Sequence, residues 1–343
     1  IVKGGTSYAL GTGAIGIGKN VFSNGAYAVA TGYNAAAQGS GAIAIGGAEW
    51  ADLNNDGMPG VDEATFAYGD NAIAVGSLAA ASGTGAMAFG AQTHALADNA
   101  TAIGTASLAQ GESSTATGAN SVAMGFESSA YGANSWACGD ETTAVGGGSV
   151  AEGIASTALG KGANAVGDFS TASGSGAVAL GVNSTAVGYS AQANADSSYA
   201  GGDNAQANGI ASVALGAYSV ADGSSSLALG SGARSSGWNS MAAGANAVAD
   251  APNAMSIGSY SMASGWNSTA IGIGSVAQLF NSTAVGNGAT SGLNGVALGQ
   301  GAMSGAWWFN EDTQTTELIG SGGTAVGQFP SASGESSTAI GGT

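Results

Sequence analysis

The segment Gly181-Val-Asn-Ser-Thr-Ala-Val-Gly188 contains the pattern that decides the fold of this 343-residue chain. Steps of seven residues from Gly76 to Gly286 meet glycine at every position except Ala97, Ala195, Ala251 and Leu279. The residue two before each of these positions is alanine, apart from two serines, and the residue four before is always Ala, Ser or Thr. One register held over such a length indicates an internal structural repeat.

The spacing within each seven-residue unit predicts a short β-strand followed by a turn. Side chains alternate across a strand, so the small residues at −2 and −4 share one face, and their uniform size predicts a narrow interior. Glycine suits a turn that needs positive φ or a close approach of two backbones. An α-helix is excluded, because glycine at every seventh position would cost about 1 kcal/mol each time. Asparagine, which tolerates the left-handed region, is frequent at −5: Asn71, Asn99, Asn120, Asn134, Asn183, Asn267 and Asn281.

The outward positions, −1 and −3, reveal that two such units make one coil of 14 residues. Apolar pairs such as Val213/Leu215 alternate with polar pairs such as Gln206/Asn208. The coil therefore has two short strands, one with an apolar outer face and one with a polar outer face. The alternation blurs between Gly118 and Gly181, where Val122/Met124 and Trp136/Cys138 fall on the other half.

A coil lined with alanine buries little apolar area, so a single chain of this kind is weakly stabilised on its own. It also exposes an apolar stripe along one face, which soluble monomers seldom do. We therefore expect a homo-oligomer in which copies of the stripe pack together. The residues do not fix the number of chains.

Composition excludes several classes of function. Four Lys and Arg residues against 21 Asp and Glu give a net charge of −17, which disfavours nucleic acid and anionic lipid as partners. No apolar run approaches the roughly 20 residues of a membrane span, so this segment should not insert into a membrane. Cys138 is the only cysteine and His94 the only histidine, which leaves few candidates for a Ser/His/Asp or Cys/His set, so we expect no enzyme. We expect His94 on the apolar outer face, as an interface residue.

Residues 47–68 interrupt the repeat and match a calcium-loop pattern, D-x-[DN]-x-[DN]-G-x5-E, from Asp52 to Glu63. Calcium prefers six to eight oxygen ligands, which this cluster can reach with water. Pro59 and the lack of flanking helices depart from a helix–loop–helix hand, and a solvated surface loop without metal is the alternative. The candidate Ca²⁺ ligands are Asp52, Asn54, Asp56, Met58 through its carbonyl, Glu63, and Asp62 as an alternative closing ligand.

Aromatic residues suggest two places where a ligand could bind. Residues 307–320 read as an inserted β-hairpin whose Trp307, Trp308 and Phe309 either contact a ligand or pack on the coils or between protomers. Trp238 and Trp266 each follow a repeat position and lie two coils apart, either as part of a surface aromatic row or as a chance pair.

The repeat resembles a known family at segments such as Asn120-Ser-Val-Ala-Met-Gly125, Asn267-Ser-Thr-Ala-Ile-Gly272 and Asn281-Ser-Thr-Ala-Val-Gly286. These look like the head repeat of trimeric autotransporter adhesins, the Yersinia adhesin type, and the likeness extends over nearly the whole chain. It implies a left-handed parallel β-roll, assembled as a homotrimer on the surface of a Gram-negative bacterium and held there by a stalk and an outer-membrane anchor. It also implies binding to extracellular matrix protein, cells, other bacteria or abiotic surfaces, as in virulence and biofilm formation.

The prediction is therefore an all-β, non-enzymatic adhesin head. Two alternatives remain: a passive spacer in a surface fibre, or an ice-binding solenoid, for which Thr143, Thr157, Thr171 and Thr185 stack at one-coil spacing. The expected parts are N-terminal coils at 1–46, the inserted loop at 47–68, the main roll at 69–306, the hairpin at 307–320 and C-terminal coils at 321–343.

Overall fold

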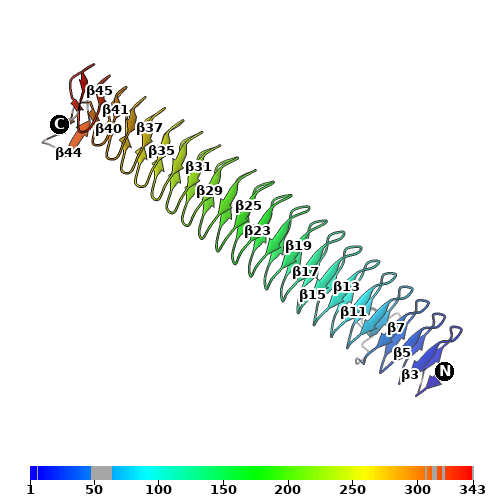
Figure 1. Cartoon of the computed structure of the whole chain (residues 1–343). Helices are drawn as coiled ribbons and strands as arrows, with labels where there is room; N and C mark the ends of the chain where they lie inside the picture. The colour runs from blue at the N-terminus through cyan, green and yellow to red at the C-terminus, as the bar shows by residue number, and fades with distance from the viewer. Residues whose placement is uncertain (6, 48–63, 306, 311–314, 319–320, 342–343) are drawn as a thin grey trace. The chain divides into compact units, whose positions relative to one another are not determined.

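The computed structural model describes residues 1–5, 7–47, 64–305, 307–310, 315–318 and 321–341. The chain divides into two compact units, Ile1–Gly176 and Ala177–Thr343, and both are built from short strands and turns. Figure 1 shows the strands of each unit following one another coil by coil. In the part of the chain that the structure describes, no helix is long and apolar enough to cross a membrane.

The first unit contains two parallel sheets, called sheet A and sheet B here, with each coil giving one strand to each. Sheet A comprises β1 (Val2–Lys3), β3 (Ile15–Ile17), β5 (Val29–Thr31), β7 (Ile43–Ile45), β9 (Ile73–Val75), β11 (Met87–Phe89), β13 (Thr101–Ile103), β15 (Thr115–Thr117), β17 (Ser129–Tyr131), β19 (Thr143–Val145), β21 (Thr157–Leu159) and β23 (Thr171–Ser173). Sheet B comprises β2 (Tyr8–Ala9), β4 (Phe22–Ser23), β6 (Ala35–Ala37), β8 (Thr65–Ala67), β10 (Ala80–Ala81), β12 (His94–Ala95), β14 (Leu108–Ala109), β16 (Val122–Ala123), β18 (Trp136–Ala137), β20 (Val150–Ala151) and β22 (Asn164–Ala165).

The second unit repeats this plan and adds a separate two-stranded sheet. Its sheet A comprises β25 (Thr185–Val187), β27 (Tyr199–Gly201), β29 (Val213–Leu215), β31 (Leu227–Leu229), β33 (Met241–Ala243), β35 (Met255–Ile257), β37 (Thr269–Ile271), β39 (Thr283–Val285), β41 (Val296–Leu298), β45 (Thr324–Val326) and β47 (Thr338–Ile340). Its sheet B comprises β24 (Val178–Ala179), β26 (Gln192–Ala193), β28 (Gln206–Ala207), β30 (Val220–Ala221), β32 (Arg234–Ser235), β34 (Val248–Ala249), β36 (Met262–Ala263), β38 (Val276–Ala277), β40 (Thr290–Ser291), β42 (Met303–Ser304) and β46 (Ser331–Ala332). The two remaining strands are β43 (Trp307–Asn310) and β44 (Thr315–Leu318).

The strand register confirms the parallel β-solenoid. Thr101 pairs with Thr115 in sheet A, and Leu108 pairs with Val122 in sheet B, so equivalent residues lie 14 positions apart. One coil of the second unit is shorter by one residue, because Thr283 pairs with Val296, 13 positions on.

The interior of both units is as narrow as the repeat predicts. The alanines at −2 are fully buried, and the largest side chains with no exposure are Val21, Thr65, Thr93 and Thr142. Several buried serines that precede sheet-B strands donate their hydroxyl to the carbonyl of the glycine three residues earlier, as Ser135 does to Gly132 at 2.8 Å. These bonds give the buried serine hydroxyls a partner inside an interior that is too narrow for larger side chains.

The two turns of each coil use glycine differently. Glycines that end sheet-A strands have φ near +130°, as Gly216 does at 132°. Residues with a Cβ rarely adopt this backbone conformation. Glycines that end sheet-B strands, such as Gly223, have ordinary φ and lie close to the carbonyl of the next coil. The four exceptions to the glycine ladder, Ala97 among them, all follow sheet-B strands, where positive φ is not required. The asparagines at −5 have φ between 53° and 57°, which confirms their predicted role.

Two places in the register mark inserted residues. In the first unit Ala36 pairs with Phe66, 30 positions on, and the coil resumes with the buried Ala64 and β8. The coil therefore resumes before residue 69, the boundary that the sequence predicts. In the second unit Val296 pairs with Thr324, and between them β43 pairs antiparallel with β44, which is the arrangement of a β-hairpin.

Candidate attachment surfaces

The outer face of sheet A carries the predicted apolar stripe in each unit. Ile103 and Leu159 in the first unit, and Val187 and Leu215 in the second, lie at −1 positions and remain between 39 and 42% exposed. They occupy the same register position: Val145 pairs directly with Leu159 in the first unit, whereas Gly201 lies between Val187 and Leu215 in the second. Val122, Trp136 and Val178 lie on sheet B, so both sheets carry apolar outward residues between Gly118 and Gly181, which confirms the blurred alternation expected there.

A row of hydroxyl groups also lies on sheet A of the first unit. It joins paired positions of consecutive strands and is made of Thr101, Thr115, Ser129, Thr143, Thr157 and Thr171. All six residues are half-buried. The row is longer than the threonine series noted in the sequence, and Thr185 belongs to the second unit. Because it shares its face with the apolar stripe, any partner that covers the stripe also covers the hydroxyl groups.

A row of apolar side chains, three of them aromatic and exposed, runs along one edge of the second unit, where each coil turns from sheet B to sheet A. We call it the edge row, and it consists of Trp238, Pro252, Trp266, Phe280 and Leu293. Trp238 is 57% exposed, Trp266 59% and Phe280 47%. Successive parallel strands are about 4.8 Å apart, so the two tryptophans lie about 9.6 Å apart along the stack.

An asparagine ladder flanks the edge row on the next turn position. The Nδ2 of Asn253 donates to the Oδ1 of Asn267 at 3.1 Å, and Asn267 donates in the same way to Asn281 at 3.1 Å. Asn281 continues the ladder to Asn294 at 3.2 Å. Backbone bonds tie the two rows together, because the amide of Asn281 donates to the carbonyl of Trp266 at 2.9 Å. The rings therefore project from turns that are fixed coil to coil.

In the first unit, carboxylates on the equivalent turn accept hydrogen bonds from the backbone. The Oδ1 of Asp98 accepts from the amide of Thr84, one coil earlier, at 2.7 Å, and Asp140 accepts from Phe126 at 2.8 Å. Among the described residues no group of three or more His, Cys, Asp or Glu side chains is placed to hold a metal ion. The candidate Ca²⁺ ligands Asp52, Asn54, Asp56, Met58, Asp62 and Glu63 lie outside the described residues.

The single histidine and cysteine both lie on sheet B. His94 belongs to β12, so its predicted position on the apolar face is wrong; the phase of the repeat places it on the opposite sheet. Cys138 follows β18 and is partly buried. Burial, and to a smaller degree the charge of Glu152, raise the pKa of the Cys138 thiol, which keeps it protonated at neutral pH.

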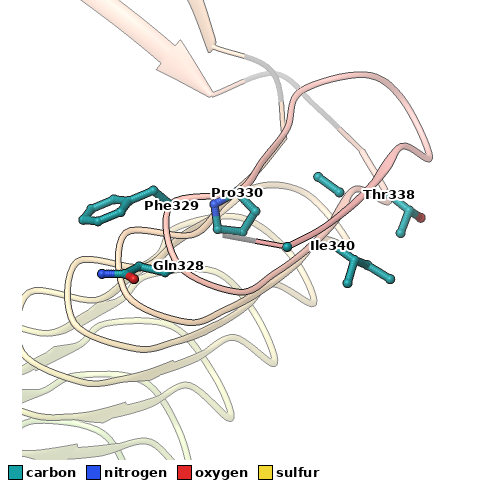
Figure 2. Close-up of a pocket in the computed structure, with 7 residues that line it drawn as sticks. Gln328, Phe329, Pro330, Thr338 and Ile340 are labelled. Carbon is teal, nitrogen blue, oxygen red and sulfur yellow. The ribbon is translucent and has the colours of Figure 1, made fainter. Parts of the chain in front are cut away.

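An open pocket of about 480 Å³ lies at the last coils of the second unit, and Figure 2 shows the residues that line it. Gln328, Phe329 and Pro330 line one side, and Thr338 and Ile340 of β47 line the other. Its lining contains no ionisable side chain, so it offers neither an acid, a base nor a charged anchor for a ligand.

The predicted ligand-binding residues thus fall into two groups. Trp238 and Trp266 lie on one exposed edge, whereas for Trp307, Trp308 and Phe309 the structure describes the strand β43 alone. The edge row also includes Phe280 and Leu293, and the asparagine ladder accompanies it; neither was singled out in the sequence as part of a site. The sequence contained this signal: the edge-row residues come directly after the residue that ends each sheet-B unit, and the asparagines come one position later.

These features define a parallel β-solenoid that displays rows of exposed side chains. The family model for the YadA head domain repeat matches more than half of the chain, at residues 23–48, 81–107, 104–128, 116–139, 137–163, 151–177, 160–184, 179–205, 193–219, 207–233, 235–261 and 263–289. The chain therefore belongs to the YadA head-repeat family, the adhesin-head family that the sequence resembles.

A search of solved structures found similarity to the collagen-binding domain of the Yersinia adhesin YadA. The identity is 25%, the match covers 63% of this chain and 80% of that one, and the TM-score is 0.20. A search of curated proteins found no match.

Proposed function

We propose that this chain is a non-enzymatic adhesin head that attaches a bacterium to extracellular matrix protein, cells, other bacteria or abiotic surfaces. It acts outside the cell, as a homotrimer anchored to the outer membrane. Membership of an adhesin-head family supports the general role. The edge row of the second unit is the observation that carries the proposal, because large exposed aromatic side chains without a partner mark interaction surfaces.

The repeat makes such a surface effective even when each contact is weak. The edge row presents similar side chains at a spacing of about 4.8 Å, so one long ligand can contact several coils at once. Three copies in one assembly multiply the number of rows that a surface can engage. The avidity of linked sites can exceed a single affinity by about 10²- to 10⁴-fold without any new contact.

Attachment through the edge row predicts a large loss of adhesion in the Trp238→Ala/Trp266→Ala variant. Beads coated with the purified chain should bind collagen-coated, cell-coated or polystyrene surfaces, and the double variant should bind at least about tenfold less. Trp136→Ala is the matched control, since Trp136 is 47% exposed but lies on β18 of the first unit. Full adhesion by the double variant would reduce these coils to a spacer, and thermal hysteresis of the wild-type chain would favour the ice-binding alternative.

We further propose that the loop at Asp52–Glu63 binds Ca²⁺, on the strength of its oxygen-ligand spacing. Isothermal titration should show calcium binding to the wild-type chain and its loss in Glu63→Ala, which removes the closing carboxylate. Glu112→Ala is a suitable control, because it removes one carboxylate elsewhere in the first unit. Absence of calcium heat from the wild-type chain would leave the solvated-loop reading in place.

A further inference from the structure

We infer that the edge row and the asparagine ladder together form a platform for a neutral, linear polysaccharide. This inference rests on the proposed function and specifies the chemistry of the ligand. Two independent observations lead to it: the exposure of the rings at regular spacing, and the hydrogen-bonding capacity of the ladder beside them.

The rings supply flat apolar surface at intervals that suit an extended polymer. Trp238 and Trp266 are both more than half exposed, and Phe280 follows on the next coil. Pro252 separates the two tryptophans and is itself half-buried, so the apolar row continues between them. The C–H faces of pyranose rings are apolar and flat enough to stack on aromatic rings, and aromatic side chains commonly line sugar-sized sites with a few fixed polar groups.

The ladder supplies donors and acceptors in equal number. A carboxamide has two N–H donors and two oxygen lone pairs. Asn267 uses one N–H toward Asn281 and one lone pair toward Asn253, which leaves one of each for a ligand. Hydroxyl groups both donate and accept, so a polysaccharide can meet both halves of each amide. A proline-rich peptide chain offers mainly carbonyl acceptors, and would leave the lone pairs of the ladder unmet.

Charge restricts the ligand further. The edge row and its ladder contain no ionisable residue, although the chain as a whole has a net charge of −17. Asp250, the nearest carboxylate in sequence to Pro252, lies 3.6 Å from the Nε of Arg234. An anionic polymer would gain nothing from the neutral rows and would be repelled by the chain, so the observations favour an uncharged glycan.

The test uses the whole chain with cellohexaose, xylohexaose and chitohexaose as probes in isothermal titration. At least one of them should bind the wild-type chain, and Trp238→Ala/Trp266→Ala should weaken that binding at least about tenfold. Asn267→Gly should weaken it by about threefold or more, because it removes the amide while glycine accepts the φ of 56° at this position. Trp136→Ala should leave it unchanged, and circular dichroism should show the wild-type spectrum for each variant.

Three results would overturn the inference: no binding of any hexasaccharide, binding that the variants leave intact, or binding of a (Pro-Pro-Gly)₁₀ peptide in place of the sugars. The last result would identify a proline-rich chain as the partner of the same row. Failure here is distinguishable from failure of the adhesin proposal, because bead adhesion lost in Trp238→Ala/Trp266→Ala would remain valid without any sugar binding. If neither bead adhesion nor sugar binding changed in Trp238→Ala/Trp266→Ala, the edge row would have no part in either proposal.

Discussion

Aspartate at both Val187 and Leu215 should dissociate the assembly into single chains. Wild-type protein should sediment as a species three times the 32.1 kDa chain mass, whereas the double variant should approach one chain mass. Both side chains lie on the outer face of sheet A and are 39% exposed in the single chain. In a trimer that covers this stripe, each carboxylate would be buried without a partner, which costs about 3–5 kcal/mol. Each interface would then weaken by at least about a hundredfold.

The control must add the same charge to the same unit on the other sheet. Gln192 and Gln206 occupy outward −3 positions of sheet B on β26 and β28, in the same stretch of coils. Gln192→Asp/Gln206→Asp should therefore retain the wild-type sedimentation mass. A wild-type chain that remains monomeric at high concentration would refute the trimer, and equal dissociation of both variants would show that added charge, rather than the stripe, decides assembly.

Alanine in place of Gly216 should destabilise the second unit far more than alanine in place of Gly223. Gly216 ends a sheet-A strand with φ of 132°, and a Cβ there would lie 2.5 Å from the carbonyl oxygen of Gly230. A residue forced into this region costs about 1–3 kcal/mol, and the backbone contact adds to that. The midpoint of thermal unfolding, followed by circular dichroism at fixed protein concentration, should fall markedly for Gly216→Ala.

Gly223 is the matched comparison because it ends a sheet-B strand half a coil later. A Cβ there also meets a neighbouring carbonyl, at 2.0 Å, yet its φ is ordinary. The chain itself places Ala195, Ala251 and Leu279 at equivalent turns, so a small shift of the coil accommodates a side chain. Similar melting midpoints for the two variants would contradict the distinction between conformational strain and close approach.

The coil could be predicted because its determinants are local and repeated. Strand, turn and glycine recur in phase, so a single register read from Gly76 to Gly286 fixes strand pairing through the main part of each unit. The positive φ of the asparagines at −5 could be predicted from the same repeat. The 13-residue coil before β41 was not foreseen, because it falls beyond Gly286, where the loss of one residue leaves no composition signal.

The surface was harder to predict than the coil. Periodicity assigns side chains to the outside but does not say which outward residues gather on one edge, so Trp238 and Trp266 were noted without Phe280 or the asparagine ladder. His94 was assigned to the wrong sheet because the polarity of one outward residue is a weak guide to the half-coil that carries it. The calcium loop depends on residues that follow no repeat, so its spacing remains the basis of that prediction.

The uniform alanine and serine interior has a consequence for how such heads can change length. Within either unit, one coil offers the next the same small buried residues wherever it occurs. Gain or loss of a whole coil therefore exchanges one contact for an equivalent one and requires no compensating substitution in the core. Because stability in such stacks is nearly a sum over neighbouring repeats, recombination between similar coils can lengthen or shorten the stack in single steps. The turn-edge side chains can meanwhile vary independently, so length and binding chemistry can evolve separately.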